Sequence, residues 1–200
     1  MVRLSRVESA RLTREKLLSA AEEVFAERGF EAATLEEVAT RAGFTRGALY
    51  ANFDGKSSLF LALLDRWLED HEAWFDQHEA TEPSVRQLIE ALQQLPGNNY
   101  ADRRQYMLVT EFRLHALRNP ELLPRLSAHE GRIRQWYARA VSAVSARSGL
   151  EVGEEEAQRL GLLVSCLEYG VASLAHIDEV IPHQTFVTLL TDLARLSANR

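Results

Sequence analysis

The chain has 200 residues, 46% of them hydrophobic, and a formal net charge of −6, a composition that suits one large core or a small head with a larger body. Its single cysteine, Cys166, excludes an internal disulfide, and the apolar neighbours Leu163, Val164 and Leu167 predict a buried structural thiol. No stretch approaches 18 uncharged apolar residues and no signal-peptide run is present, so we expect a cytoplasmic protein without a membrane partner.

The negative charge is unevenly distributed along the chain. Residues 1–56 carry nine basic and nine acidic side chains, which leaves 14 basic and 20 acidic ones in residues 57–200. The net acidity therefore does not argue against nucleic-acid binding by the first part. Residues 1–16 contain five basic and two acidic side chains, which predicts either a flexible arm that contacts DNA or a disordered solubilising segment.

Two short helices are predicted after a first, longer one. Thr34 is a good N-cap and Glu37 follows three residues later, which is the pattern of a capping box. Gly43 ends this helix, and Thr45 can cap a second helix that extends to about residue 53. Two helices joined by a turn of a few residues are typical of the helix-turn-helix motif of DNA-binding proteins.

The second short helix has an apolar face and an outward face. Ala48, Leu49 and Phe53 can pack on the preceding helix. The outward face carries Thr45, Arg46, Gly47, Tyr50 and Ala51. Glycine costs roughly 1 kcal/mol relative to alanine inside a helix, so its presence here indicates close approach to a phosphate or a base edge. Lys56 follows a turn and opens a long helix, where its charge and the helix N-terminus predict a phosphate clamp.

These residues resemble the tetracycline-repressor (TetR) family of bacterial transcriptional regulators. The family's linked motifs are matched in order by Phe25-Ala-Glu-Arg-Gly-Phe30, Thr34-Leu-Glu-Glu-Val-Ala39, Gly47-Ala-Leu-Tyr-Ala-Asn-Phe53 and Lys56. The resemblance covers about the first quarter of the chain. It implies an all-α homodimer that binds a double-stranded DNA operator, most simply as a repressor released by a small-molecule effector.

The resemblance also implies roles for individual residues. Phosphate binding falls to Thr34, Thr45, Tyr50 and Lys56, and contact with base edges to Arg46 and Gly47. One departure from the family pattern is Asn52, where many members have histidine. An asparagine amide can still donate a hydrogen bond to a phosphate, so we keep Asn52 among the expected DNA-binding residues.

The rest of the chain is predicted to be helical, because apolar residues recur at helical spacing and no segment alternates as a strand does. With the two short helices, segments at about 13–28, 57–78, 82–96, 101–117, 121–148, 153–176 and 182–198 make about nine helices. No linker is long enough to separate further domains. We expect a DNA-binding domain over residues 1–56 and an effector-binding and dimerisation domain over residues 57–200.

The last two predicted helices carry broad apolar stripes. One contains Leu163, Leu167, Val171 and Leu174, and the other contains Phe186, Leu189 and Leu193. A core helix inside a monomer could account for either stripe, and this alternative stays open. The family resemblance implies instead a four-helix interface between two copies, and two-fold symmetry suits an operator made of two half-sites.

Aromatic and histidine side chains are concentrated between the head and these stripes. The candidate effector-binding residues are Trp67, Trp74, Tyr106, Phe112, His115, Trp136, Tyr169 and His176. Each one alone is as well explained by core packing. Together they suit a mostly apolar pocket with a few polar groups, which predicts an apolar or aromatic ligand. The alternative is a body that only dimerises and senses no effector, and a close-packed interior would favour it.

The sequence offers no catalytic constellation. It lacks a Gly-x-Ser-x-Gly motif, a phosphate-binding glycine loop and a dinucleotide fingerprint. Glu111 and His115 lie four residues apart and could hold a metal ion, but a third and a fourth ligand are not identifiable. We therefore expect neither an enzyme, nor a metal site, nor a cofactor.

Overall fold

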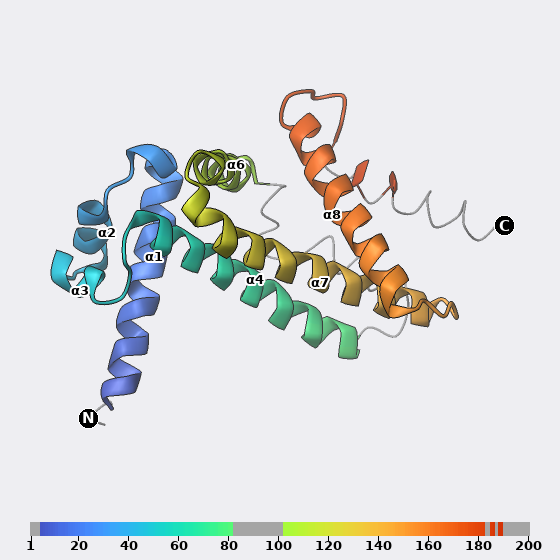
Figure 1. Ribbon diagram of the computed structural model, residues 1–200, viewed down its shortest axis with the longest axis horizontal. Coiled ribbons are helices and arrows are strands. Elements are labelled where there is room, and N and C mark those ends of the chain that lie inside the picture. The colour runs from blue at the N-terminus through green and yellow to red at the C-terminus, as the bar shows by residue number, and fades with distance from the viewer. Residues whose placement is uncertain (1–4, 82–101, 183–184, 187, 190–200) are drawn as a thin grey trace. The chain divides into compact units, whose positions relative to one another are not determined.

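The computed structural model describes residues 5–81, 102–182, 185, 186, 188 and 189. Over these residues the chain is helical and has no strand, which confirms the all-α prediction (Figure 1). The helices in the described part are α1 (Arg6–Ala32), α2 (Leu35–Ala42), α3 (Arg46–Tyr50), α4 (Lys56–Thr81), α6 (Arg103–Arg118), the short 3-10 helix η1 (Pro120–Leu122), α7 (Leu123–Arg147) and α8 (Glu154–Ala175). Seven α-helices are thus described where about nine were expected, and the two others, at 82–96 and 182–198, lie wholly or mostly outside the described residues.

The described chain divides into two compact units. The first contains the described residues up to Trp67 together with Met107–Leu126, and the second contains the remaining described residues. The first unit therefore extends beyond the predicted boundary after residue 56, since the beginning of α4 and most of α6 pack with α1, α2 and α3. The functional division into a DNA-binding domain over 1–56 and an effector-binding domain over 57–200 stays a prediction.

The core of the first unit is a cluster of four phenylalanines from α1, α4 and α6. Phe60 lies in edge contact with Phe25 and Phe30, with ring centroids 5.1 and 5.2 Å apart, and stacks on Phe112 at 4.7 Å. Phe30 also meets Phe112 edge to face at 5.1 Å. All four side chains are buried. Aromatic pairs at these separations are favourable beyond the area they bury, so this cluster joins α6 firmly to the helices of the predicted head.

Helix α1 begins earlier than the sequence pattern predicted. It starts at Arg6 and not near residue 13, because Ser5 and Glu8 form a capping box. The Glu8 amide donates to the Ser5 hydroxyl at 3.2 Å, and the Ser5 amide donates to the Glu8 carboxylate at 2.8 Å. The expectation of a flexible basic arm over residues 1–16 is therefore wrong from Arg6 onward. Arg11, Arg14 and Lys16 lie on this helix.

The other end of α1 turns at a glycine. Gly29 has φ 76° and ψ 168°, a conformation that is essentially restricted to glycine. A Cβ at this position would also lie 3.1 Å from the Glu111 Oε2 atom. The same carboxylate accepts a hydrogen bond from the Phe30 amide at 2.8 Å. The glycine therefore both bends the chain and makes room for a side chain of α6.

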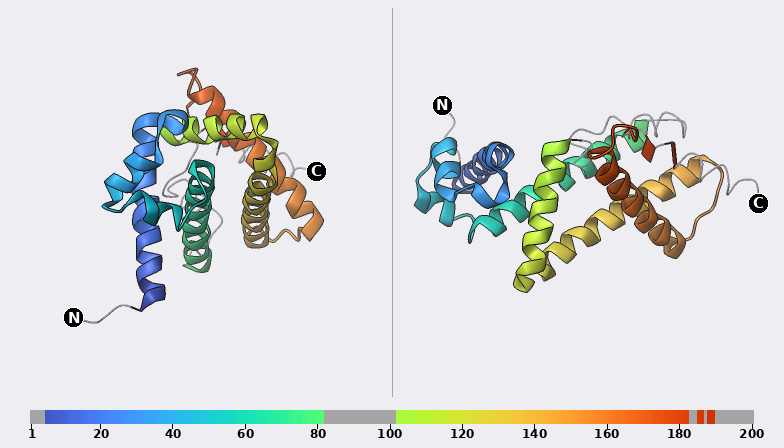
Figure 2. Two further views of the ribbon diagram at one scale, coloured as in Figure 1. Left: turned by 60° about the vertical axis from the view of Figure 1, so that its left-hand side comes forward. Right: turned by 90° about the horizontal axis from the view of Figure 1, so that it is seen from above.

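In the second unit, α4 and α7 enclose an apolar cluster. Its buried members are Leu68, Phe75, Trp136, Tyr137, Ala140 and Ala143. Helix α8 crosses α7 closely, because a Cβ on Gly161 would lie 2.7 Å from the backbone nitrogen of Ala138 (Figure 2). Only a glycine allows this approach. Cys166 of α8 is exposed, so the prediction of a buried thiol is wrong.

Candidate nucleic-acid interface

Helices α2 and α3 form the predicted helix-turn-helix and lie beside α1 (Figures 1 and 2). Thr34 caps α2 in a capping box with Glu37, as the sequence indicated. Gly43 ends α2 in the left-handed conformation with φ 74°, and the Phe44 amide donates to the Ala39 carbonyl at 2.9 Å. The turn is closed by Thr45, whose hydroxyl accepts from the Ala48 amide at 3.2 Å and caps α3.

Buried side chains fix which surface of α3 faces the solvent. Leu49 and Phe53 are buried with Val38 and Ala39 of α2. The residues that remain exposed are the ones predicted to face outward: Thr45, Arg46, Gly47, Tyr50 and Ala51. Helix α3 is shorter than expected and ends at Tyr50, because residues 51 and 52 form a turn.

Arg46 and Tyr50 interact with each other on the exposed face of α3. The Arg46 Nη2 group donates to the Tyr50 hydroxyl at 3.2 Å, and the guanidinium lies 5.3 Å from the centre of the Tyr50 ring. The hydrogen bond to Tyr50 is the main reason that the pKa of Arg46 is raised above its ordinary value. The other guanidinium donors of Arg46 have no hydrogen-bond partner among the described residues. A charged donor is thus held in a defined position on an open surface.

Gly47 adjoins this pair and is not required by the fold. Its φ is not positive, and a Cβ built on it would meet only the Thr45 hydroxyl, at 3.8 Å, which is an ordinary contact. An alanine would therefore fit the free protein. The space above Gly47 is open, which agrees with close approach of another molecule to the backbone of α3.

The predicted phosphate-binding side chains differ in how far their donors are already occupied. The Thr34 hydroxyl donates to the Glu37 carboxylate at 2.9 Å, and this bond is the largest cause of the lowered pKa of Glu37. The Asn52 amide group donates to the Ala48 carbonyl at 2.8 Å. The Lys56 ammonium donates to the Glu31 carbonyl at 2.7 Å and lies 4.8 Å from the centre of the Phe30 ring, and two of its N–H groups are not used in a hydrogen bond to the described residues. Thr34 therefore has no donor left, Asn52 keeps one, and Lys56 keeps two together with a positive charge, so Lys56 is the best prepared for a phosphate.

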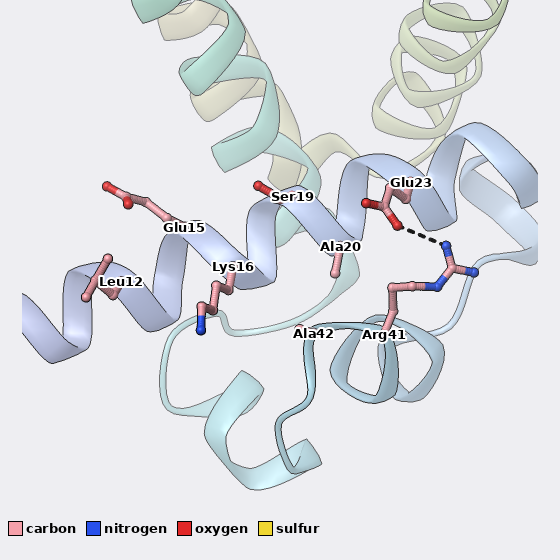
Figure 3. Close-up of a pocket in the computed structure, with 8 residues that line it drawn as sticks. All are labelled: Leu12, Glu15, Lys16, Ser19, Ala20, Glu23, Arg41 and Ala42. Carbon is pink, nitrogen blue, oxygen red and sulfur yellow. Dashed lines mark hydrogen bonds and ion pairs between the residues drawn. The ribbon is translucent and has the colours of Figure 1, made fainter.

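A shallow pocket of about 290 Å³ lies in the same unit, between α1 and the end of α2 (Figure 3). Its lining balances Lys16 and Arg41 with Glu15 and Glu23. Arg41 donates to Glu23 at 3.1 Å and to Glu27 at 2.9 Å, and the bond to Glu27 lowers the pKa of that carboxylate. Arg41 thus secures α2 on α1. We assign no ligand to this pocket.

Three of the predicted effector-binding residues belong to the first unit, where each has a structural contact. The Trp67 indole N–H donates to Glu22 of α1 at 2.8 Å. Phe112 is part of the phenylalanine cluster. His115 places its Nδ1 atom 3.1 Å from the Glu31 carboxylate and its Nε2 atom 3.5 Å from the Ser57 hydroxyl. These contacts connect α4 and α6 to α1.

The other five lie in the second unit and form two groups. Tyr106 of α6 lies near Tyr169 and His176 of α8, with ring centroids 6.0 and 4.9 Å apart. Trp136 packs against Phe75 at 5.9 Å, and its indole N–H is buried without a hydrogen-bond partner among the described residues. Trp74 packs against the cluster that contains Trp136 and stacks on His78 at 3.8 Å. Whether these groups bind an effector stays a prediction.

Phe75 was not among the predicted effector-binding residues, although it contacts one of them. It is fully buried in the same cluster as Leu68 and Trp136. Apolar residues occupy many positions of α4, so helical periodicity alone did not distinguish Phe75 from an ordinary core residue.

The apolar stripe of α8 is partly exposed. Leu163 and Leu174 are 52% and 54% exposed, and Leu167 is partly buried. Val171 differs from the prediction, because it is buried within its own unit. Of the second predicted stripe, Phe186 is partly buried and Leu189 is 38% exposed, while Leu193 lies outside the described residues. An exposed row of leucines of this kind is suited to a protein interface.

Glu111 and His115, the pair that could have held a metal ion, have other partners. Glu111 accepts from the Phe30 amide and His115 lies against Glu31. Over residues 5–81 and 102–182, no group of three or more potential metal ligands occurs. In the same part of the chain, no helix combines the length and the apolar character that crossing a membrane requires.

Comparisons with known proteins agree with this geometry. A family model described as bacterial regulatory proteins, tetR family, matches residues 17–63. The repressor BepR of Brucella suis is 46% identical over 65 residues, which cover 32% of this chain and 31% of BepR. The regulator UidR of Escherichia coli is 25% identical over 180 residues, 88% of each chain. The structure of Salmonella enterica GusR has a TM-score of 0.61 and 27% identity, and the match covers 91% of this chain and 93% of GusR.

The matches with higher identity cover a smaller share of the chain. The first curated relatives, at 40–46% identity, are matched over only about a third of their own length. Matches over most of the chain have lower identity, as with UidR and GusR. The family model itself matches residues 17–63, which contain the helix-turn-helix.

Proposed function

We propose that this chain, which belongs to the TetR family of bacterial regulatory proteins, is a DNA-binding transcriptional regulator that acts as a homodimer on a palindromic operator. The observation that carries the proposal is the exposed face of α3, where Arg46 is held by Tyr50 beside the open surface of Gly47. The edge of a guanine presents two acceptors in the major groove, and arginine is the usual partner for them. Arg46, positioned by its hydrogen bond to Tyr50 on the exposed face of α3, is suited to contact a guanine in this way.

In this proposal, the residues that contact base edges differ from those that contact phosphates. We assign contacts with base edges to Arg46 and Gly47. The phosphate contacts are assigned to Thr34, Thr45, Tyr50, Asn52 and Lys56. Thr34 has to exchange its internal hydrogen bond for one to DNA, whereas Asn52 keeps one unused N–H donor and Lys56 keeps two. We therefore expect Lys56 to contribute most to the phosphate contacts.

The exposed leucines of α8 support a homodimer. Leu163 and Leu174 are separated by about three helical turns on one side of α8, and both are about half exposed. Contact with the same surface of a second copy would cover them and place two heads on one DNA molecule. Two heads joined in this way read two half-sites about one helical turn apart.

We further propose that the regulator is a cytoplasmic repressor released by a small molecule. BepR is named a repressor, and the structural relative SmeT is described as the repressor of a multidrug efflux pump. For this chain, the aromatic groups around Trp136 and Tyr106 support an apolar or aromatic effector. An effector that binds only the conformation unable to fit DNA would shift the population away from the operator. A body that only dimerises is the alternative.

The experiment that tests the DNA-binding proposal compares two substitutions over a salt series. Lys56→Met should weaken binding to all duplexes alike and lower the salt slope by about 0.9 per head, because one phosphate contact is lost. Arg46→Ala should instead relax the preferred base at one position of each half-site, with about 1–3 kcal/mol less discrimination. Arg159→Ala, which removes an exposed arginine paired with Glu155 of α8, is the control for charge.

Each outcome of this comparison is decisive. If Arg46→Ala selects the same operator as the unmodified protein, Arg46 does not recognise a base. An unchanged salt slope in Lys56→Met removes Lys56 from the interface.

For the effector, tryptophan fluorescence should change together with DNA release when a ligand binds. A ligand that releases DNA without any contact in the second unit would contradict the proposed effector site.

A further inference from the structure

Helix α3 is too short to fix its own orientation. It has five residues, fewer than two turns, and isolated helices of this length are unstable. The direction in which Arg46 and Gly47 point therefore depends on contacts with the rest of the first unit. Leu49 and Phe53 bury one side of the segment, and a hydrogen bond adds a directional restraint to this apolar packing.

Arg14 of α1 makes the additional contact. Its Nη1 group donates to the Asn52 carbonyl at 3.2 Å, and its guanidinium carbon lies 4.4 Å from the centre of the Phe53 ring. Asn52 and Phe53 follow Ala51, the C-cap of α3, and their amides both donate to the Leu49 carbonyl at 2.9 Å. Arg14 thus holds the chain just where α3 ends, through one polar and one aromatic contact.

The chemistry of this contact is specific to arginine. A planar guanidinium can lie on an aromatic ring and donate sideways to a carbonyl at the same time. A lysine ammonium has the same charge but no plane, so it cannot reproduce both contacts in one geometry. A positive group near the end of a helix is also favourable, because carbonyl groups are unpaired there.

We propose that Arg14 is a positioning residue for DNA recognition, which sets the angle at which α3 presents Arg46 and Gly47 without itself touching a base. The inference rests on the proposed function. In this proposal Arg14 acts through its contacts with Asn52 and Phe53. The alternative for a basic residue of α1 is direct contact with a DNA phosphate. The two roles predict different responses to a lysine substitution.

The test uses the full-length protein with Arg14→Lys, and Arg28→Lys as the control on the same helix. Arg28 lies 3.5 Å from Glu37 and has no contact with the α3 segment among the described residues. Operator affinity should fall about tenfold in Arg14→Lys, within the range expected for loss of one good base contact. Affinity for unrelated DNA and the salt slope should not change, because the charge is kept.

A measurement without DNA separates the inference from the proposed function. Amide hydrogen exchange at Asn52 and Phe53 should become several-fold faster in Arg14→Lys, while exchange at Phe44 in the α2–α3 turn should stay as in the unmodified protein. Unchanged exchange at Asn52 and Phe53 overturns the inference, and so does an operator affinity that falls only in parallel with affinity for unrelated DNA. If the unmodified protein selects no DNA sequence, the proposed function fails, and the inference fails with it.

Discussion

Replacing Gly47 by alanine should separate DNA binding from stability. The added Cβ meets only the Thr45 hydroxyl, at 3.8 Å, and the backbone there is not in the left-handed region. A compatible Gly→Ala change stabilises a protein by about 0.4–1 kcal/mol, since the unfolded chain loses freedom. For a chain of this length, we expect the thermal midpoint to rise by about 1–4 °C.

The same methyl group should weaken operator binding. Gly47 lies on the surface of α3 that is proposed to approach the bases, and an extra methyl in a close-packed contact costs about 1–3 kcal/mol. The operator Kd should therefore rise about five- to 150-fold. Fluorescence anisotropy with labelled operator DNA measures the Kd, and differential scanning calorimetry measures the midpoint.

A second glycine provides the control for this experiment. Gly131 of α7 has similar room, because an added Cβ would meet only the Arg134 side chain at 3.7 Å. Gly131→Ala should raise the midpoint in the same way and leave the operator Kd unchanged. If Gly47→Ala also leaves the Kd unchanged, α3 does not approach DNA closely at Gly47, and the reasoning is refuted.

Three further predictions concern the joint of α1, the dimer and the response to acid. Gly29→Ala should lower the free energy of unfolding by about 2–3 kcal/mol in urea titrations, because alanine is strained at this φ and meets Glu111; an unchanged value would exclude strain at the joint. Leu163→Glu should give folded monomers in analytical ultracentrifugation, and a persisting dimer would show that the exposed row of α8 is not the interface. The lowered pKa of Glu37, caused first by the Thr34 hydroxyl, stabilises the folded state above pH 4.5. This contribution is lost as the pH falls further, so the stability difference between the unmodified protein and Glu37→Gln should shrink in acid denaturation curves; a difference independent of pH would contradict it.

Local signals in the sequence were sufficient to predict the helix-turn-helix. The helix caps bind partners only a few residues away, so their roles follow from spacing alone. These caps are Thr34, Gly43 and Thr45. The exposed face of α3 followed from the positions of Leu49 and Phe53. The capping box of Ser5 and Glu8 carried an equally local signal, and it would have predicted the early start of α1.

Contacts between distant segments could not be predicted in the same way. Glu111 and His115 contact the end of α1 although they lie more than 80 positions away in the sequence, and no spacing in the sequence pairs them with Phe30 or Glu31. Trp67 reaches Glu22 in the same manner. The sequence identified these side chains as unusual, but only the fold decides whether an aromatic or a histidine supports another helix or faces a ligand.

The most direct test of the account is selection of DNA by the unmodified protein from a library of random duplexes. The account predicts enrichment of one family of sequences made of two inverted half-sites, with centres about 10 base pairs apart or a multiple of this spacing. The base that Arg46 contacts should appear as a preferred guanine at one position of each half-site. A library that returns without enrichment, or with a single site lacking two-fold symmetry, would contradict the account.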